Sequence, residues 1–401
     1  MKKIISILVL LFTSILFGRA QTSVIGEYVS SVKTKSQTPI DYIFDQFKSA
    51  DIVVIGERDH RDTTQYELIL DILKDPRFAK EIGYVYTEVG CENRTSEVNN
   101  LIKGRFQTQE EFTTQLYSYL REAEVFYPLW EKYNRVQFLR GLYEINRDSR
   151  RKITLGLTDC AFSWSDISDA KEYKDWVCNV FKDFYYSAAC EYRDSTMAAN
   201  FSKMYAQQKP KRGKRKALII TNQPHAINAT MAKRDYNRQG KWLKEQYGEE
   251  KGKIVILNWA EYRLFDGKRM PLIAGGLWDA AFEKMDCKPF AMDIKGTPFG
   301  STPYLDRAYG NLKWEDVADG IIYYKPFYET VLTVGIPGIV SVDFEKEFMR
   351  RFTIYYEALL GGSVPKFEDM KPLYDGFISV SGTYPQSPES VKEEIRAILS
   401  K

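Results

Sequence analysis

The chain has 401 residues, 44% of them hydrophobic and 28% charged, so it can bury a large core and is not an intrinsically disordered protein. The formal net charge is +3, but three of the 57 basic residues lie in the first 20 positions, which leaves 54 basic residues against 54 acidic ones. The formal charge therefore gives no indication of the basic surface that nucleic-acid binding needs, and no nucleic-acid partner is expected.

The first 20 residues have the pattern of a secretory signal peptide. Two lysines precede the apolar run Ile4–Phe17, which ends at the small-x-small site Gly18-Arg19-Ala20. We expect cleavage near Ala20 and an exported mature chain, periplasmic or extracellular, with no cysteine at its start to carry a lipid. No later stretch of about 18 apolar residues follows, so no stable membrane span is predicted.

Beyond this segment, short β-branched runs alternate with segments of helical period. The predicted strands are Ile52–Ile55, Tyr84–Val89, Ile153–Leu157, Ala217–Thr221, Ile254–Leu257 and Ile321–Tyr324. The predicted helices are Tyr42–Phe47, Thr64–Leu73, Glu110–Leu120, Leu129–Asn146, Asp166–Tyr205, which is long enough to break once, and Ala226–Tyr247. This alternation is typical of an α/β fold with a mainly parallel sheet covered by helices on both faces.

We expect residues 21–401 to form a single α/β domain. A helical insertion is predicted around 93–146, and the Gly/Pro-rich region 271–310 is predicted to form loops over one edge. Both segments flank the predicted rim and are expected to set specificity. The tryptophans nearby either line a cleft or pack in the core; they are Trp130, Trp164, Trp259 and Trp278.

Five cysteines are too few for a disulfide framework in a chain of this length. Cys178 and Cys190 fall on one predicted helix, where 12 residues rise about 18 Å, which is too far for a bridge. Cys91 and Cys160 each follow a predicted strand, and whether they are bridged is open. The basic run Lys209–Lys216 is interpreted as a solvated approach to the next strand, with a local basic patch as the alternative.

Polar side chains follow four consecutive predicted strands. The first strand leads into Gly56-Glu57-Arg58-Asp59-His60, the second ends at Glu88, the third ends at Asp159, and the fourth leads through Asn222 to His225. Ligands of open α/β sheets bind at the carboxyl ends of the strands, where these groups would meet. Both histidines of the chain lie in this set, so the pattern predicts a functional site on that rim.

Two local features are expected next to the first motif. Gly56 is predicted to turn the backbone tightly, and the spacing of Glu57 and His60 places both side chains on one side of a helical first turn. Asp62 or Thr63 is expected to cap the helix that follows.

These residues resemble the erythromycin esterase family and the wider superfamily that includes ChaN-like haem-binding proteins and TraB-type metalloproteases. The matching features are Gly-Glu-x-x-His at residues 56–60, Glu88 closing the second strand, and the Asn-bearing stretch 222–225 that ends in histidine. Tyr192–Asn200 is similar to the Arg-Asp-x-x-Met-x-x-Asn helix motif of the erythromycin esterases and favours that branch.

The resemblance implies a hydrolase that activates water against an ester or amide. The implied catalytic residues are His60, Glu57, Glu88, His225, Arg193 and Asp159. His60 is expected to be the general base, with Glu57 or Glu88 holding its tautomer, while His225 polarises the carbonyl or protonates the leaving group. A Gly-x-Ser-x-Gly elbow is missing from the sequence, so a serine hydrolase of that design is not predicted.

Two alternatives stay open. No cofactor is required by the esterase interpretation, but Glu57, His60, Glu88 and His225 would also suit one zinc, manganese or cobalt ion with an open position for water, as in a metal-dependent peptidase. The other alternative is a ChaN-like protein that binds haem or metal without catalysis. The expected partner of the hydrolase is a small-molecule or peptide substrate, which the sequence does not name.

Overall fold

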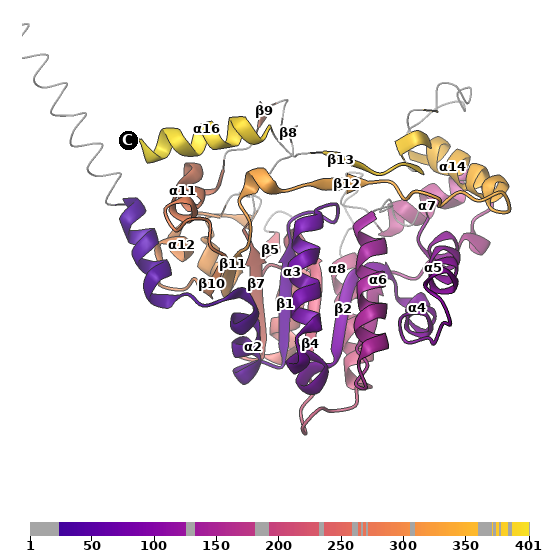
Figure 1. Cartoon of the computed structure of the whole chain (residues 1–401), viewed down its shortest axis with the longest axis horizontal. Coiled ribbons are helices and arrows are strands. Elements are labelled where there is room, and N and C mark those ends of the chain that lie inside the picture. The colour runs from indigo at the N-terminus through magenta and orange to yellow at the C-terminus, as the bar shows by residue number, and fades with distance from the viewer. Residues whose placement is uncertain are drawn as a thin grey trace, which may run out of the picture. The chain divides into compact units, whose positions relative to one another are not determined.

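The computed structural model describes residues 24–125, 133–180, 192–231, 236–258, 264–265, 268–269, 272–304, 309–359, 371, 374–376, 378–383 and 387–400. Its main sheet has seven strands in the order β10-β11-β7-β1-β4-β2-β3 (Figure 1). The pairings β1–β4, β4–β2, β2–β3 and β11–β7 are parallel, and β10–β11 is antiparallel. The predicted α/β fold with a mainly parallel sheet is confirmed. The predicted signal peptide lies outside the described residues.

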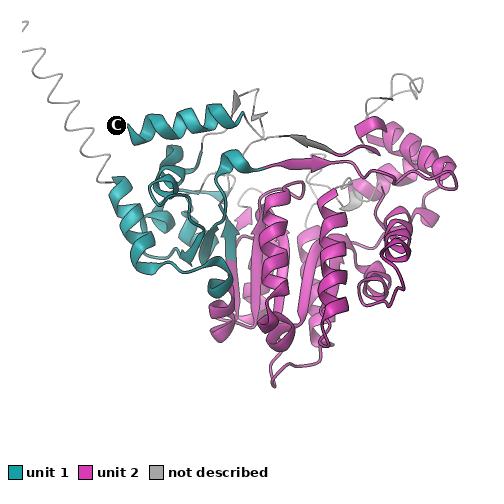
Figure 2. Ribbon diagram, in the orientation of Figure 1, with its two compact units in different colours: residues 1–42, 255–330, 384–401 teal, residues 43–254, 331–383 magenta. Residues whose placement is uncertain are grey.

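The chain divides into two compact units (Figure 2). Unit 1 consists of residues 1–42, 255–330 and 384–401, and unit 2 consists of residues 43–254 and 331–383. In the part of the chain that the structure describes, no helix combines the length and the apolar character needed to cross a membrane.

Unit 2 holds four parallel strands whose side chains are almost all buried. They are β1 (Ile52–Glu57), β2 (Tyr84–Cys91), β3 (Thr154–Asp159) and β4 (Ala217–Asn222). Continuous apolar runs fit strands that are covered on both faces. The register pairs Glu57 of β1 with Asn222 of β4, and Cys91 of β2 with Asp159 of β3. The carboxyl ends of all four strands therefore meet at one edge.

Helices of unit 2 cover these strands, with α3 and α6 in front of them and α8 behind them in Figure 1. Asp62 caps the first of these helices, because its side chain accepts a hydrogen bond from the backbone of Thr64 at 2.9 Å. The longer helices of this unit are α3 (Thr63–Lys74), α4 (Thr95–Ile102), α5 (Gln109–Ala123), α6 (Tyr133–Asp148), α7 (Ala170–Val180), α8 (Tyr192–Ala206), α10 (Gln239–Tyr247) and α14 (Glu345–Leu359). Helices α4, α5 and α6 occupy the region predicted as a helical insertion.

Unit 1 contains β10 (Phe290–Asp293), β11 (Gly320–Tyr323) and the C-terminal part of β7 (Gly252–Leu257). Helix α16 (Pro388–Leu399) begins with a proline at its first turn and buries one apolar face. Leu272, Ala280, Phe327, Val391 and Ile395 form a core cluster in this unit.

All six predicted strands are present, but one predicted helix is wrong. The predicted helix Ala226–Tyr247 is instead the short helix α9 (Gln223–Ala226), the hairpin β5 (Thr230–Met231) and β6 (Tyr236–Asn237), and then α10. The chain folds back here because Gly240 packs against the carbonyl oxygen of Ala226, so close that a Cβ would lie 1.7 Å from that oxygen. Within the predicted helix 166–205 the structure has α7 and α8, and residues 181–191 between them lie outside the described residues.

The region 271–310, predicted as loops, also needs correction. It holds α11 (Leu277–Glu283), β10 and α12 (Pro298–Ser301), which Thr297 caps by accepting a hydrogen bond from the backbone of Gly300 at 3.2 Å. Aromatic packing outweighs the local breaker residues, since Trp278 lies 5.1 Å from Phe299, centroid to centroid.

Trp164 and Trp278 are core residues rather than cleft lining, because both side chains are buried. Trp130 and Trp259 lie outside the described residues. Cys91, Cys160, Cys178 and Cys287 are free thiols. Cys190 lies outside the described residues.

The approach of Gly240 to Ala226 gives a stability prediction. Replacing Gly240 by Ala should lower the free energy of unfolding by about 1–3 kcal/mol, because α9 and α10 must move apart to admit the methyl group. Urea denaturation measures the change. Gly26→Ala is the control, since a Cβ there meets nothing within 4 Å, and equal stabilities of the two variants would contradict the close packing.

Candidate active site

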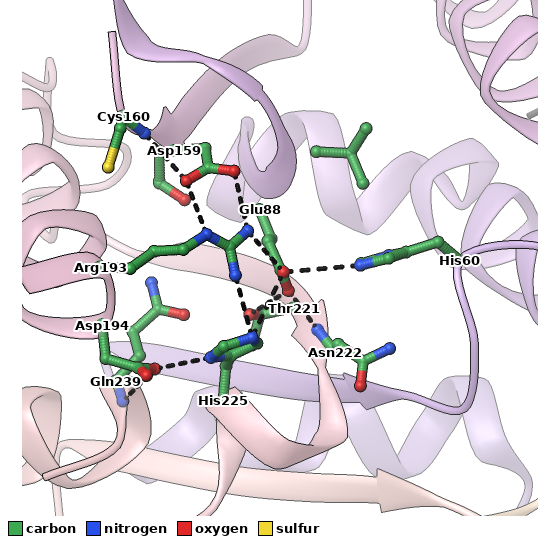
Figure 3. A network of polar contacts seen from close by, with 12 residues as sticks. His60, Glu88, Asp159, Cys160, Arg193, Asp194, Thr221, Asn222, His225 and Gln239 are labelled. Atoms are coloured by element: carbon green, nitrogen blue, oxygen red, sulfur yellow. Dashed lines mark hydrogen bonds and ion pairs between the residues drawn. The ribbon is translucent and has the colours of Figure 1, made fainter. Parts of the chain in front are cut away.

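The six residues predicted for the site lie in one polar network at the carboxyl edge of unit 2. Figure 3 labels all of them except Glu57. Strands and helices each deliver part of it. Strands β1, β2 and β3 supply Glu57, Glu88 and Asp159, helix α8 supplies Arg193, helix α9 supplies His225, and the turn before α3 supplies His60.

Glu88 is the centre of this network. Its Oε1 atom accepts a hydrogen bond from Arg193 Nη2 at 2.8 Å and lies 3.5 Å from His60 Nε2 and 3.6 Å from His225 Nε2. Its Oε2 atom accepts from the Thr221 hydroxyl at 2.9 Å and from the Asn222 backbone at 2.7 Å. Burial alone would raise the pKa of Glu88, but the charges of His225 when it is protonated, of Arg193 and of His60 outweigh it and hold that pKa well below its usual range. Glu88 is therefore a buried carboxylate that stays ionised.

The position of Glu88 depends on an irregularity in β2. The pairing of β2 with β3 is regular as far as Thr87, and then its register shifts before Cys91. Gly90, with φ of +112°, lies within this shift. A bulge of this kind re-aims a side chain at the end of a strand. From the sequence, Glu88 was predicted to close the second strand. In the structure β2 continues beyond Glu88 to Cys91.

Arg193 joins three elements through one guanidinium group. It donates to both carboxylate oxygens of Asp159, at 3.0 Å from Nε and 2.8 Å from Nη2, in addition to its bond with Glu88. Its Nη1 atom lies 3.0 Å from His225 Nε2. Two-point contact between a guanidinium and a carboxylate fixes orientation as well as charge, so Arg193 is held rigidly.

The contacts of His225 define its tautomer. A guanidinium can only donate hydrogen bonds, so the Nε2 atom that faces Arg193 must be the acceptor and carries no proton. The proton of the neutral ring then lies on Nδ1, which donates to Asp194 Oδ1 at 2.9 Å. The His225 side chain is 17% exposed, against 8% or less for the other charged groups of the network, so it is the group that solvent reaches most easily.

Asp194 was not among the residues predicted for the site. It accepts hydrogen bonds from His225, the Tyr236 hydroxyl, Arg238 Nη1 at 3.2 Å and the Gln239 backbone at 2.9 Å. Burial alone would raise the pKa of Asp194, but His225 and its other partners outweigh it and lower that pKa to about 2. Its place beside Arg193 in the helix motif was an available signal. Tyr236 and Arg238 had none, because they lie in the segment predicted as helix.

His60 lies between two carboxylates. Its Nδ1 atom is 2.7 Å from Glu57 Oε2, and its Nε2 atom faces Glu88 Oε1. Burial alone would lower the pKa of His60, but Glu57 and Glu88 together outweigh it and raise that pKa to about 9. His60 is therefore an imidazolium at neutral pH and holds a proton that it can donate.

Backbone contacts clamp the turn that carries His60. The Asn134 side chain of α6 donates to the His60 carbonyl oxygen. Strand β12 (Leu332–Val334) adds a hydrogen bond from the Thr333 backbone to Arg61 O at 2.8 Å. The turn is not helical, so Glu57 and His60 meet across the end of a strand rather than along a first helical turn.

Gly56 serves a different purpose from the one predicted. It lies inside β1, and its φ is not in the left-handed region. A Cβ at this position would lie 3.3 Å from both Gln223 Cα and the Ala226 side chain. Gly56 thus lets α9 approach β1 closely, which brings His225 to the network.

The other charges of the first motif are paired locally. Arg58 Nη2 lies 2.6 Å from Asp62 Oδ2, and Arg61 Nη2 lies 2.9 Å from Asp59 Oδ2. These pairs neutralise the charges that flank His60 and leave Arg193, Arg238 and the protonated His60 as cations of the network.

The predicted metal set does not have the form of a metal site. Among the described residues, no group of three or more His, Cys, Asp or Glu side chains is arranged to hold a metal ion. Arg193 hydrogen-bonds both Glu88 and His225, so a cation bound by these two residues would first have to displace a guanidinium group. The residues present do not fit a divalent ion, and we assign no step to one.

No family model and no curated protein matches the chain. Among solved structures, it is similar to a Bacillus cereus protein, with a TM-score of 0.47 and 10% identity over 75% of this chain and 97% of that chain. It is also similar to a succinoglycan biosynthesis protein, with a TM-score of 0.45 and 12% identity over 76% and 97% of the two chains. A mutant of the erythromycin esterase EreC in its open conformation has a TM-score of 0.46 and 10% identity over 71% and 92%. These likenesses do not assign a function to the chain.

The raised pKa of His60 predicts a pH dependence of stability. A folded-state pKa of about 9 against the ordinary 6.5 makes a contribution of about 3 kcal/mol that is fully present below pH 6.5 and is lost as the pH rises through 9. Urea denaturation of the wild type and His60→Gln at pH 6 and above pH 9 measures it. The difference in the free energy of unfolding between the two proteins should be smaller at the higher pH. A difference that is constant with pH would show that His60 is not protonated in the folded protein.

Proposed function

We propose that this chain is a hydrolase in which His225 activates water for attack on an ester or amide. The observation that supports it most directly is the pair of His225 contacts, Nδ1 with Asp194 Oδ1 and Nε2 with Arg193 Nη1, which favours the neutral tautomer with its proton on Nδ1 and a lone pair on Nε2. A neutral imidazole held in this way by a carboxylate is suited to take a proton from water.

In the proposed first step, a water molecule replaces the Arg193 contact at His225 Nε2. His225 takes one proton from this water, and the water oxygen bonds to the carbonyl carbon of the substrate. The π electrons of the carbonyl move to its oxygen, which becomes an oxyanion. Asp194 stabilises the imidazolium that forms, because its carboxylate accepts the Nδ1 proton throughout.

The oxyanion needs positive partners, and the site has two. Arg193 and the protonated His60 both contact Glu88 Oε1, so they converge on one region of the rim. Preorganised donors in a buried site stabilise developing negative charge without costly reorganisation. When the tetrahedral intermediate collapses, the bond to the leaving group breaks and that group takes the proton from His225, which returns the ring to its neutral form.

This proposal exchanges the roles that the sequence had suggested for the two histidines. His60 was expected to be the base, but an imidazolium with a pKa of about 9 and a 4% exposed side chain has no lone pair to offer at neutral pH. His225 has the lone pair and the greater exposure. Glu57 then acts as a positioning residue that keeps His60 charged.

The choice of ester or amide follows from the sequence resemblance to erythromycin esterases, and the substrate is proposed to be a small molecule or a peptide. Export to the periplasm or the medium belongs to the same proposal, since it depends on the pattern of the first 20 residues. In that location the site would meet substrates from outside the cytoplasm.

Substitution of the proposed base and its partner tests the mechanism. His225→Gln and Asp194→Asn should each lower kcat on a panel of ester and amide substrates by about 10²-fold or more, since general-base assistance is lost or misdirected. Glu124→Gln is the control, because Glu124 is also a buried carboxylate, and it bonds Arg135 and Tyr119 outside the network. Full activity of His225→Gln, with its fold verified by circular dichroism, would exclude the proposal.

The charge of His60 predicts the alkaline limb of the rate profile. Activity should fall as the pH rises through about 9, because His60 loses the proton that stabilises the oxyanion. The pH profiles of kcat for the wild type and His60→Gln measure this effect. His60→Gln should have a lower kcat at pH 7, and its kcat should not fall as the pH rises through about 9. An unchanged fall in the variant would show that another group causes it.

A further inference from the structure

Basic residues gather at the end of unit 2 opposite the site. They lie in segment 147–152 before β3, in segment 209–216 before β4, and after α4. The set, called the basic edge below, is Lys103, Arg150, Arg151, Lys152, Lys209, Lys211, Arg212, Lys214, Arg215 and Lys216. Because these segments precede parallel strands, the basic edge lies at the amino ends of the strands whose carboxyl ends carry the candidate site.

Short contacts show that the three segments meet. Lys211 Cε lies 2.9 Å from the position that a Cβ of Gly83 would take, just before β2. The Gly83 carbonyl oxygen accepts from the Thr154 backbone at 2.9 Å at the start of β3. Lys103 Nζ donates to the Thr154 hydroxyl at 2.8 Å. The ammonium groups of Lys103 and Lys211 are therefore neighbours at one spot of the edge.

The basic edge lacks counter-charges. Within the described residues, Arg212, 3.1 Å from Glu81, is the one member with a carboxylate oxygen within 4 Å. The other acids nearby are already matched, since Asp148 pairs with Arg147 at 2.8 Å. Elsewhere on the surface many lysines do have partners, as in Lys171–Asp175, Lys253–Glu250, Lys371–Asp375 and Lys392–Glu389.

Repulsion between these cations lowers the pKa values of two lysines of the basic edge. The pKa of Lys103 is lowered by partial burial and by the positive charge of Lys211. Burial lowers the pKa of Lys216, and Lys214 and Arg212 lower it further, although Glu81 and Asp51 oppose them. The edge thus carries a positive potential that an external anion would relieve.

The segment 209–216 forms a projecting hairpin of fixed shape, at the lower edge of unit 2 in Figure 2. Lys211 and Lys214 exchange backbone hydrogen bonds of 2.8 and 2.9 Å, and Gly213 at the tip has open space around it. The Tyr205 hydroxyl holds the Arg215 carbonyl at 2.8 Å. A rigid convex tip flanked by shorter basic loops can touch a flat surface but cannot enclose a strand.

We propose that the basic edge docks this protein on an anionic lipid bilayer surface. Clustered lysines and arginines are attracted to acidic headgroups without inserting. Segments 147–152 and 209–216 contain no aromatic residue and no Leu, Ile, Val or Met, so the tip offers nothing for base stacking or for insertion into the acyl region. The docked molecule turns its carboxyl edge, with His225, away from the bilayer and toward the aqueous phase.

Vesicle sedimentation of the mature chain tests the proposal. Binding to phosphatidylcholine vesicles with about 30% phosphatidylglycerol should be at least about tenfold tighter than to pure phosphatidylcholine, and about 0.5 M NaCl should abolish it. The combined substitution of Lys209, Lys211, Lys214 and Lys216 by Gln should remove this preference. The control replaces Lys171, Lys253, Lys371 and Lys392 by Gln, changes the net charge equally, and should keep it.

Three results would overturn the proposal. One is wild-type binding that does not discriminate between the two kinds of vesicle. Another is an equal loss in the control variant, which would mean that net charge alone acts. The third is tighter binding to duplex DNA than to the anionic vesicles at the same salt concentration. None depends on hydrolysis, so the proposed function and this docking surface fail separately.

Discussion

The ion pair between Glu88 and Arg193 is the interaction on which the candidate site depends. It places a carboxylate of β2 and a guanidinium of α8 in contact, with side chains that are only 1% and 8% exposed. Removing one partner of such a pair leaves an uncompensated buried charge, so the two residues must be kept together. Through Asp159 and His225, the same guanidinium also fixes β3 and α9. One side chain thereby sets the distances among four elements.

Much of this fold is predictable from the sequence, because buried parallel strands leave a strong pattern. Runs such as Ala217–Thr221 are apolar on both faces and can hardly be anything but central strands. The segment 226–247 gave a misleading signal, since its helical period continues through a hairpin that a tertiary contact at Gly240 imposes. The region 271–310 failed for the opposite reason, because buried aromatics such as Trp278 stabilise elements that its glycines and prolines disfavour.

Most of the residues that form the site could be predicted from the sequence, but the protonation states of its histidines could not. Residues at strand ends, such as Glu57 and Asp159, are found by counting along the chain. The protonation of a histidine depends on what faces each nitrogen, and that is a three-dimensional fact. His60 faces two carboxylates, while His225 faces two carboxylates and a guanidinium, and the sequence spacing contains no trace of this difference. Asp194 could have been found from the sequence, because it stands beside Arg193 in the motif Tyr192–Asn200.

Gly56 has a consequence for how precisely the two histidines are placed. The contact between β1 and α9 at this position involves main chain from both sides and the small side chain of Ala226, with no rotamer to change. The spacing between the strand that leads to His60 and the helix that carries His225 is then set by atomic radii rather than by the packing of flexible groups. Thermal motion of side chains therefore changes the spacing between β1 and α9 very little. The relative position of the two rings therefore depends mainly on the backbone of β1 and α9.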